Sequence, residues 1–448
     1  MLELDLTAEL EEPPGRPTPP VPWEQVPLTQ WNDWRWQLAH RISTVEELEK
    51  IISLTPEERA GLEAPEHFPV AITPYFASLM DPANPHCPIR RQVVPTAEEL
   101  VSEDSMMADS LNEEAHSPVP GLVHRYPDRV LMLVTAHCAA YCRFCTRSRI
   151  VGDAHNPFNR ANYARQIAYI AATPQVRDVL ISGGDPLLMN QAVLEDILRR
   201  LRQIPHVEVI RIGTRAPCFL PQRITPELAE MLGRYHPLWI NIHFNHPQEV
   251  TPEVEVALAR LANAGIPLGS QTVLLAGIND CPNVIKMLVH KMVRNRVRPY
   301  YLYQCDLVRG AGHFRTPVAK GLEIMESLRG HTSGFAIPVF TIDAPDGGGK
   351  VPLLPNYLLS MSDSEVVVRN YEGFITSYAQ PSTYQRHDPQ TCAFCRARQR
   401  SGGQEGVAGL LAKEQRSIAP EHWEATHRRE GLALKVPEPT VRVKAKRQ

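Results

Sequence analysis

The chain has 448 residues, of which 43% are hydrophobic and 22% charged, and its formal net charge is −3. This length and composition allow a large hydrophobic core and exclude a fibrous or wholly disordered protein. The small net charge gives no general attraction to nucleic acid or to an anionic membrane, and we expect neither as a partner.

The N-terminal segment is acidic and rich in proline, and it lacks the basic start and apolar middle of a signal peptide. We therefore expect residues 1–22 to be a disordered tail and the protein to be cytoplasmic. Nine cysteines, an odd number, also fit a reducing compartment. Residues 23–115 are predicted to be helical, since acidic residues follow Thr44 and Thr55 as they do at helix starts.

From about residue 129, short β-branched runs alternate with helical stretches. The candidate strands are 130–134, 178–182, 207–212, 238–243, 268–275, 299–305 and 336–343. This alternation predicts a parallel sheet of βα units with right-handed crossovers. The expected fold is α/β, a partial (open) TIM-like barrel over residues 116–350, followed by a C-terminal β segment and arm over 351–448. Active groups are then expected at the C-terminal strand ends.

Three cysteines follow the first of these strands as a CxxxCxxC motif, namely Cys138, Cys142 and Cys145. Three thiolates on one short loop can bind three irons of a cubane cluster and leave the fourth iron open to a small molecule. A structural zinc site is the alternative, although it normally needs a fourth ligand. The spacing, with an aromatic residue before the last cysteine, resembles that of the radical S-adenosylmethionine superfamily. The resemblance implies a [4Fe-4S] cluster that binds and reductively cleaves S-adenosylmethionine.

A glycine turn follows the second strand, formed by Ser182, Gly183, Gly184 and Asp185. The two glycines let the backbone approach a ligand, and Asp185 supplies a negative charge. Because the turn comes one βα unit after the cysteine loop, we expect it to bind the ammonium group of S-adenosylmethionine. A turn that only caps the strand is the alternative.

Lys350 ends a glycine-rich segment after the last barrel strand. A flexible loop that presents a lysine amine at the barrel mouth suits covalent attachment of pyridoxal phosphate. Arg125 and Arg129, at the start of the cysteine strand, match the dianionic phosphate. The alternatives are a solvent loop whose lysine has no role, and an ion pair between Asp128 and either arginine.

Over most of its length the chain resembles the lysine 2,3-aminomutase family. The matching segments are 31–36, 117–122, the cysteine motif, 210–215, 220–225, 243–247, 300–306, 330–334 and the Lys350 segment. The resemblance implies that Cys138, Cys142 and Cys145 ligate the cluster, Lys350 carries pyridoxal phosphate, and Arg125 and Arg129 hold its phosphate. It also implies that Arg147 receives the substrate carboxylate and that His243 and Gln271 lie near S-adenosylmethionine. A homo-oligomer (dimer or tetramer) and a flavodoxin-type or ferredoxin-type electron donor are expected.

Two aspartates, Asp306 and Asp343, end neighbouring strands, so their carboxylates should face the same barrel mouth. A dry site cannot hold an ammonium group without a counter-charge, and the pair therefore predicts a substrate with a distal cation. The resemblance implies interconversion of L-lysine and β-lysine (3,6-diaminohexanoate) by a 1,2-amino shift. An aspartate that caps a helix or balances Arg309 is the alternative.

Two departures from the family pattern matter. Gly312 stands where an acidic residue is expected, which leaves arginine open as substrate. In the C-terminal arm the pattern CxCxxC lacks its first cysteine, so a zinc ion would need Cys392, Cys395, Cys281 of a neighbouring subunit and a replacement ligand, for which His387 is the candidate. The arm could instead have lost its metal. A non-catalytic iron-sulfur sensor or assembly protein is a remote alternative, because it needs neither Lys350 nor the aspartates.

Overall fold

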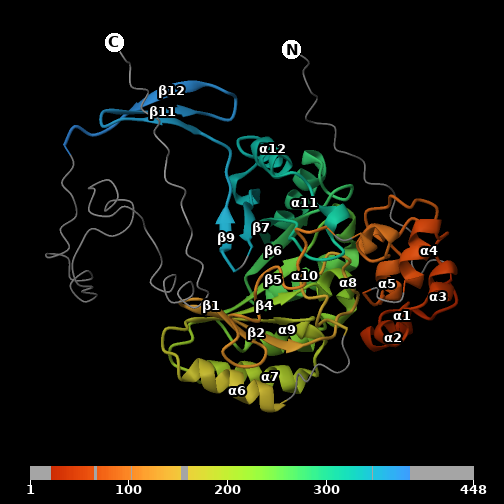
Figure 1. The fold of residues 1–448 in the computed structure, drawn as a ribbon. Coiled ribbons are helices and arrows are strands. Elements are labelled where there is room, and N and C mark those ends of the chain that lie inside the picture. Colours follow the sequence, from red (N-terminus) through yellow and green to blue (C-terminus); the bar gives the residue numbers. More distant parts are fainter. Residues whose placement is uncertain (1–21, 65–67, 102, 153–159, 346, 384–448) are drawn as a thin grey trace, which may run out of the picture. The chain divides into compact units, whose positions relative to one another are not determined.

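The computed structural model describes residues 22–64, 68–101, 103–152, 160–345 and 347–383 (Figure 1). The chain divides into two units, residues 1–361 with 366–378, and residues 362–365 with 379–448. Apart from residue 22, the expected N-terminal tail lies outside the described residues, as do His387, Cys392 and Cys395.

Short helices form the N-terminal region, as the sequence predicts. They are α1 (Leu28–Trp31), α2 (Trp34–Ala39), α3 (Val45–Glu49), α4 (Pro56–Glu63) and α5 (Pro74–Ala77), followed by the 3-10 helices η1 (Arg90–Gln92) and η2 (Ala97–Leu100). The hydroxyls of Thr44 and Thr55 accept hydrogen bonds from the third residue of α3 and α4, and glutamates at those positions bond back to the capping backbone. These capping boxes satisfy amide groups that the first helical turn leaves unpaired.

The centre of the molecule is a nine-stranded sheet in the order β1 to β9. Seven of its strands run parallel: β2 (Arg129–Thr135), β3 (Asp178–Gly183), β4 (Val209–Thr214), β5 (Leu238–His243), β6 (Leu268–Leu274), β7 (Val297–Gln304) and β8 (Val339–Ala344). All seven predicted strands are present. The sheet does not pair β1 with β9, so the partial barrel is confirmed.

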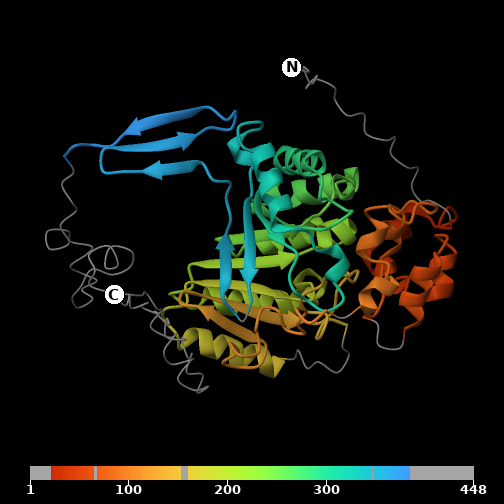
Figure 2. The ribbon, with the colours of Figure 1, turned by 45° about the horizontal axis from the view of Figure 1, so that its top comes forward.

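Helices connect successive parallel strands and lie on the outer side of the curved sheet (Figure 2). They are α6 (Arg160–Ala171), α7 (Gln191–Arg202), α8 (Ala216–Phe219), α9 (Pro226–Gly233), α10 (Pro252–Asn263), α11 (Pro282–Arg294) and α12 (Val318–Leu328), with the 3-10 helices η3 (Pro186–Leu188), η4 (Pro221–Arg223), η5 (Pro247–Glu249), η6 (Gly312–Phe314) and η7 (Gly334–Ala336). In α7 the buried residues are Leu194, Ile197, Leu198 and Leu201, which share one helix face. None of the described helices is both long and apolar enough to cross a bilayer.

The two edge strands, β1 (Leu122–Tyr126) and β9 (Gly349–Pro352), are antiparallel to their neighbours and were not predicted. The prediction that Lys350 lies in a flexible loop is wrong. Lys350 is part of β9 and pairs directly with Asp343 of β8. The glycines serve the turn before it, because Gly347 (φ +74°) and Gly349 (φ +81°) adopt left-handed backbone that other residues rarely take. The lysine is therefore held by a hairpin.

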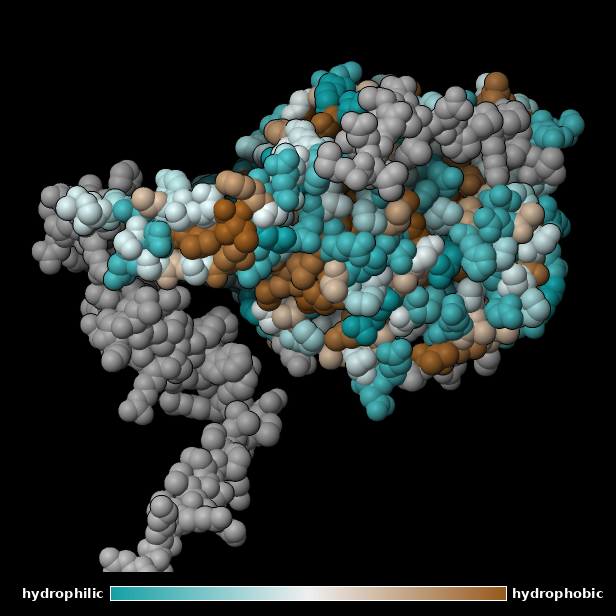
Figure 3. Space-filling view, turned by 90° about the horizontal axis from the view of Figure 1, so that it is seen from above, coloured by the Kyte–Doolittle hydropathy of each residue, from teal (hydrophilic) through white to brown (hydrophobic). Residues whose placement is uncertain are grey.

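A separate three-stranded sheet follows, formed by β10 (Leu358–Met361), β11 (Glu365–Arg369) and β12 (Ile375–Ala379). β10 and β11 are antiparallel, in agreement with the predicted C-terminal β segment. Every residue of β10 and β12 is exposed, including apolar ones. Hydrophilic residues cover most of the face shown in Figure 3, and hydrophobic residues form separate patches between them.

Candidate active site

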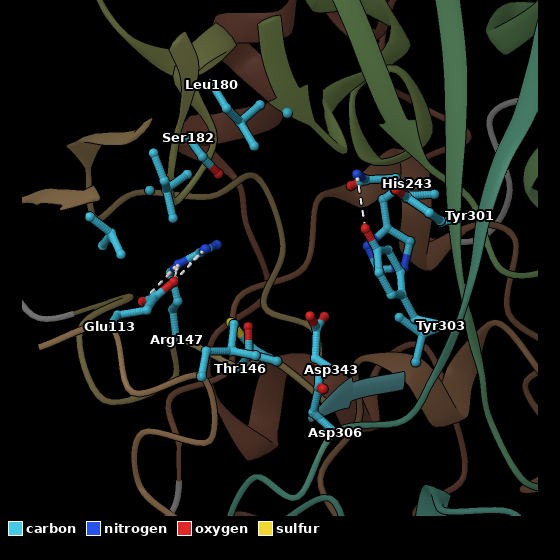
Figure 4. Close-up of a pocket in the computed structure, with 18 of the residues that line it drawn as sticks. Glu113, Thr146, Arg147, Leu180, Ser182, His243, Tyr301, Tyr303, Asp306 and Asp343 are labelled. Carbon is cyan, nitrogen blue, oxygen red and sulfur yellow. Dashed lines mark hydrogen bonds and ion pairs between the residues drawn. The ribbon is translucent and has the colours of Figure 1, made fainter. Parts of the chain in front are cut away.

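A cavity of about 510 Å³ extends along the barrel strands and includes residues at their carboxyl ends. Its walls include residues from β1 through β9, so it gathers side chains that are far apart in the sequence (Figure 4). Every predicted site residue of the barrel lines it: Arg125, Arg129, Cys138, Cys142, Cys145, Arg147, Ser182, Gly183, Gly184, Asp185, His243, Gln271, Asp306, Asp343 and Lys350.

The cysteine loop follows β2 and is anchored on the N-terminal region. The backbone amides of Tyr141 and Arg143 donate to the carbonyl oxygens of Ala71 and Gln92, at 3.0 and 2.9 Å. The buried Arg143 guanidinium also forms an ion pair with Glu99 at 2.6 Å. The helical region thus fixes the backbone on which the three thiols stand.

The three thiols together suit a cationic metal group. Burial, with a further contribution from the neighbouring cysteines, raises the pKa of the Cys138 thiol well above its ordinary value and that of Cys145 to about 12. Thiolates that repel one another in a buried site need positive charge to become stable ligands. In addition, Nε of Arg215 is buried against the cavity without an acceptor among the described residues, which fits an anionic group bound beside the cysteines.

The glycine turn approaches protein backbone as well as the cavity. A Cβ on Gly183 would lie 2.3 Å from the carbonyl oxygen of Thr135, and one on Gly184 would lie 2.4 Å from that of His137. The glycines therefore allow β3 to pack against the cysteine loop. The Asp185 carboxylate caps η3 and accepts hydrogen bonds from Thr214 Oγ1 at 2.7 Å and from the Arg215 amide at 2.8 Å. Asp185 thus has a structural role at the start of η3, and binding of the ammonium stays a prediction.

One end of the cavity is acidic. Asp306 and Asp343 lie close together there (Figure 4). Lys350 Nζ donates to both Asp343 oxygens at 2.8 Å. Burial, followed by the nearby Asp343 charge, raises the pKa of Asp306 to about 7. Lys350 Nζ also lies 4.9 Å from the centre of the Tyr303 ring. The predicted catalytic lysine and the predicted cation site are therefore in contact.

Arg147 lies at another wall and has a partner that the sequence did not reveal. Its Nη2 and Nε donate to Glu113 Oε1 at 2.7 and 3.0 Å, and Glu113 is buried (Figure 4). Glu113 also lies 3.3 Å from Arg149. This glutamate belongs to an irregular segment before β1, where no periodic pattern could identify it. Its position fixes one edge of the Arg147 guanidinium.

His243 and Gln271 stand side by side on β5 and β6, in register. His243 Nε2 and Asn245 Oδ1 are 2.9 Å apart, and burial, followed by the charge of Arg215, lowers the pKa of His243 to about 3. Gln271 Nε2 donates to Tyr303 Oη at 3.4 Å. Because His243 is neutral at ordinary pH, these two residues give the cavity a polar, uncharged wall.

The two predicted phosphate ligands flank the Lys350 turn. Arg125 Nε donates to the carbonyl oxygen of Gly347, and the Lys350 amide donates to Tyr126 Oη at 3.0 Å. Arg129 lies 4.0 Å from the Tyr126 ring centre and pairs with Asp128 at 3.3 Å, the ion pair considered as an alternative. Two guanidinium groups and a primary amine on one wall fit a phosphorylated aldehyde.

Comparison with known proteins identifies the family. Residues 132–288 match the model of the radical SAM superfamily, and residues 325–448 match the model described as Lysine-2,3-aminomutase. The L-lysine 2,3-aminomutase of Acetoanaerobium sticklandii is 53% identical over 407 residues, which cover 91% of this chain and 98% of that protein. The chain belongs to the lysine 2,3-aminomutase family. The resemblance found in the sequence is confirmed, and membership implies a [4Fe-4S] cluster and S-adenosylmethionine.

Other relatives include one of the same name and one that is named for a different amino acid. The L-lysine 2,3-aminomutase of Fusobacterium nucleatum is 56% identical over 361 residues, covering 80% of this chain and 85% of that protein. The glutamate 2,3-aminomutase of Clostridioides difficile is 46% identical over 344 residues, covering 77% and 81%. Membership alone therefore leaves the substrate to be argued from the site.

Of the two departures from the family pattern, Gly312 does not line the cavity, and the changed cysteine pattern of the arm is outside the described residues. Gly312 is in η6, and a Cβ there would lie 3.3 Å from Glu103 Oε1. Cys281 is exposed and precedes α11. Among the residues that the structure describes, no three His, Cys, Asp or Glu side chains surround one point as ligands of a single metal ion. Since the other three proposed zinc ligands are outside the described ranges, the zinc site stays a prediction.

Proposed function

We propose that the protein interconverts L-lysine and β-lysine (3,6-diaminohexanoate) by a radical 1,2-amino shift that depends on pyridoxal phosphate. The observation that carries the proposal is the charge layout of one cavity. Asp306 and Asp343 form an acidic end, the Arg147 guanidinium lies at another wall, and the Lys350 amine contacts the acidic end. A lysine substrate has matching groups, a carboxylate at one end and an ammonium at the other.

Pyridoxal phosphate would supply the carbonyl that carries the migrating amino group, and reduced, cluster-bound S-adenosylmethionine would supply the radical that removes and returns a hydrogen atom. The chain's own residues bind these cofactors and orient the substrate. Arg125 and Arg129 would hold the phosphate, Lys350 the aldehyde carbon, and Cys138, Cys142 and Cys145 the cluster. His243 and Gln271 would border S-adenosylmethionine.

The residues at the two ends of the substrate would set the position of its Cβ. Arg147, braced by Glu113, would receive the carboxylate, and the two aspartates the distal ammonium. Fixing both ends restricts the substrate to the geometry in which hydrogen transfer is possible, which is how binding groups contribute to rate. Their hydrogen bonds would also replace those that water makes to the two charged ends of the free substrate.

The acidic end disfavours glutamate. A second carboxylate beside Asp306 and Asp343 would place a third negative charge in a buried site, where like charges repel strongly. A cationic side chain instead neutralises the pair. Arginine also has a distal cation and is the second candidate, but Gly312, the feature that kept it open, is not on the cavity wall.

The decisive experiment measures turnover of anaerobically reconstituted, reduced protein with S-adenosylmethionine and pyridoxal phosphate. Products from L-lysine, L-arginine and L-glutamate are separated and identified by mass spectrometry. We expect β-lysine as the main product, and we expect Asp306→Ala combined with Asp343→Ala to lose the preference for cationic side chains. Faster turnover of arginine than of lysine would keep the reaction class and overturn the substrate.

We further propose a zinc site formed by Cys281, Cys392, Cys395 and His387, a homo-oligomer, and an electron donor of the flavodoxin or ferredoxin type. The exposed thiol of Cys281 is accessible to ligands from another subunit, which supports the first of these. Cluster reduction requires a one-electron donor, which supports the last.

A further inference from the structure

A buried polar network lies behind the cysteine loop, centred on Arg215 at the end of β4. Arg215 Nη1 donates to Sγ of Cys142 at 2.8 Å. Its Nη2 donates to Glu249 Oε1 at 2.9 Å and to Gln92 Oε1 at 2.5 Å. The residue is 6% exposed, and its guanidinium carbon lies 4.2 Å from the Phe219 ring centre. A cation is therefore held against one predicted cluster ligand.

The partners of Arg215 are themselves fixed. Glu249 and Gln92 are fully buried, and Gln92 Nε2 donates to Glu249 Oε1 at 2.8 Å. The Asn245 amide donates to the other Glu249 oxygen at 2.7 Å, and Asn245 Nδ2 donates to Gln92 at 2.9 Å. Because each member is bonded on more than one side, the guanidinium has little freedom to turn away from Cys142.

We propose that Arg215 is a positioning residue that raises the reduction potential of the iron-sulfur cluster through its hydrogen bond to Cys142, and that Glu249 offsets part of this effect. The inference rests on the proposed ligation of the cluster by Cys142. One-electron reduction adds negative charge to a cluster, so a cation bonded to a ligand sulfur stabilises the reduced form more than the oxidised form. The Glu249 carboxylate acts with the opposite sign because it is an anion, paired with the same guanidinium at 2.9 Å.

The low dielectric of the site makes both effects large. The network is buried and the aromatic faces of Phe219 and Phe144 cover the guanidinium, so water screens these charges little. A bracing role for Arg215 would also explain its contacts, since it joins the ends of β4 and η5 to the cysteine loop. The two roles predict different results when each charge of the Arg215–Glu249 pair is removed separately.

The test is a redox titration of the reconstituted full chain, monitored by electron paramagnetic resonance of the reduced cluster, with dithionite as reductant and no lysine. Arg215→Met should make the midpoint potential more negative. At the wild-type midpoint the ratio of reduced to oxidised cluster should fall about tenfold, equivalent to about 59 mV for a one-electron couple. Arg215→Lys, which keeps the charge, should restore part of the shift. Glu249→Gln, which keeps an acceptor oxygen, should move the potential the opposite way.

Arg223→Met is the matched control, because Arg223 is a buried arginine that lies 4.8 Å from the Trp34 ring and does not line the cavity. It should leave the midpoint potential unchanged. Iron and sulfide contents per chain show which variants hold a complete cluster. If the Arg215→Met variant cannot hold a complete cluster, a positive shift of the midpoint potential in Glu249→Gln still decides the inference.

Shifts of the same sign in Arg215→Met and Glu249→Gln, or no shift in Glu249→Gln, would overturn the inference and leave Arg215 as a brace. Since the titration contains no amino acid substrate, its result is independent of which substrate turns over. Failure of lysine turnover with opposite potential shifts would refute the proposed function and leave this inference standing.

Discussion

Asp343 has two possible cationic partners, the Lys350 amine and the substrate ammonium. Only one of them can bond both carboxylate oxygens at a time. In the structure Lys350 Nζ bonds both of its oxygens. If Lys350 carries pyridoxal phosphate, its amine is no longer a free ammonium, and Asp343 becomes available to the substrate. Attachment of the cofactor and formation of the cation site would then be linked at a single residue.

Asp343→Ala should therefore raise the KM for lysine steeply. Removing one member of a buried charge pair costs on the order of 3–5 kcal/mol, and Asp306 alone would have to hold the ammonium. Some turnover should persist because Asp306 remains. Steady-state kinetics on lysine provide the measurement, with the exposed Asp196→Ala on α7 as control. Unchanged lysine kinetics in Asp343→Ala would exclude Asp343 from the substrate site.

The pH dependence of kcat/KM for lysine should report the ionisation of the Asp306 carboxyl. Its carboxyl is protonated and neutral below its raised pKa of about 7, and becomes a carboxylate above it. Lysine binding needs the carboxylate, so kcat/KM for lysine should rise as the pH increases through about 7. The nearby Lys350 charge lowers the pKa of Asp306, so a loss of that charge on cofactor attachment would move the rise in kcat/KM to higher pH.

Asp306→Asn should abolish the rise of kcat/KM for lysine near pH 7 and leave the effects of other ionisable groups in place. The measurement is the pH profile of kcat/KM for the wild type and the asparagine variant. An identical step in both proteins would assign it to a different group.

At the scale of elements, the carboxyl end of β3 and the cysteine loop are packed backbone against backbone at Gly184. Gly184→Ala would place a Cβ 2.4 Å from the His137 carbonyl oxygen, immediately before the first cluster ligand. We expect this strain, typically about 1–3 kcal/mol, to displace the loop and lower the iron content while the far-ultraviolet circular dichroism stays unchanged. Gly334→Ala is the control, since its Cβ would meet nothing within 4 Å. Full iron content in Gly184→Ala would contradict this packing role.

The sequence predicted elements well where local pattern decides them. The seven parallel strands are short segments that contain β-branched or aromatic residues, and residues typical of helix N-caps precede α3 and α4. The β9 strand was missed because its glycines suggest a loop, whereas its pairing with β8 depends on a partner that no local pattern reveals. Glu113 and the support of the cysteine loop by Ala71 and Gln92 were missed for the same reason, since they are contacts between distant segments.

At the scale of the whole molecule, the three-stranded sheet β10–β12 leaves apolar side chains exposed to solvent. Its exposed residues include Leu358, Met361, Ile375 and Tyr378, and the exposed Phe374 directly precedes β12. Small sheets need a covered apolar face to be stable, and clustered exposed apolar residues indicate an interaction surface. A second copy of the chain is the partner that fits the expected homo-oligomer.

Phe374→Asp combined with Ile375→Lys should therefore reduce the mass of the particle measured by multi-angle light scattering. Both side chains are more than half exposed, at 63% and 56%, so charged replacements cost little within one subunit but oppose burial against another. Glu372→Lys, in the turn before β12, is the control for altered charge and should leave the mass unchanged. The cavity lies among residues 111–350, so the double variant should still take up iron. Equal masses for wild type and double variant would mean that the sheet is not the contact between copies.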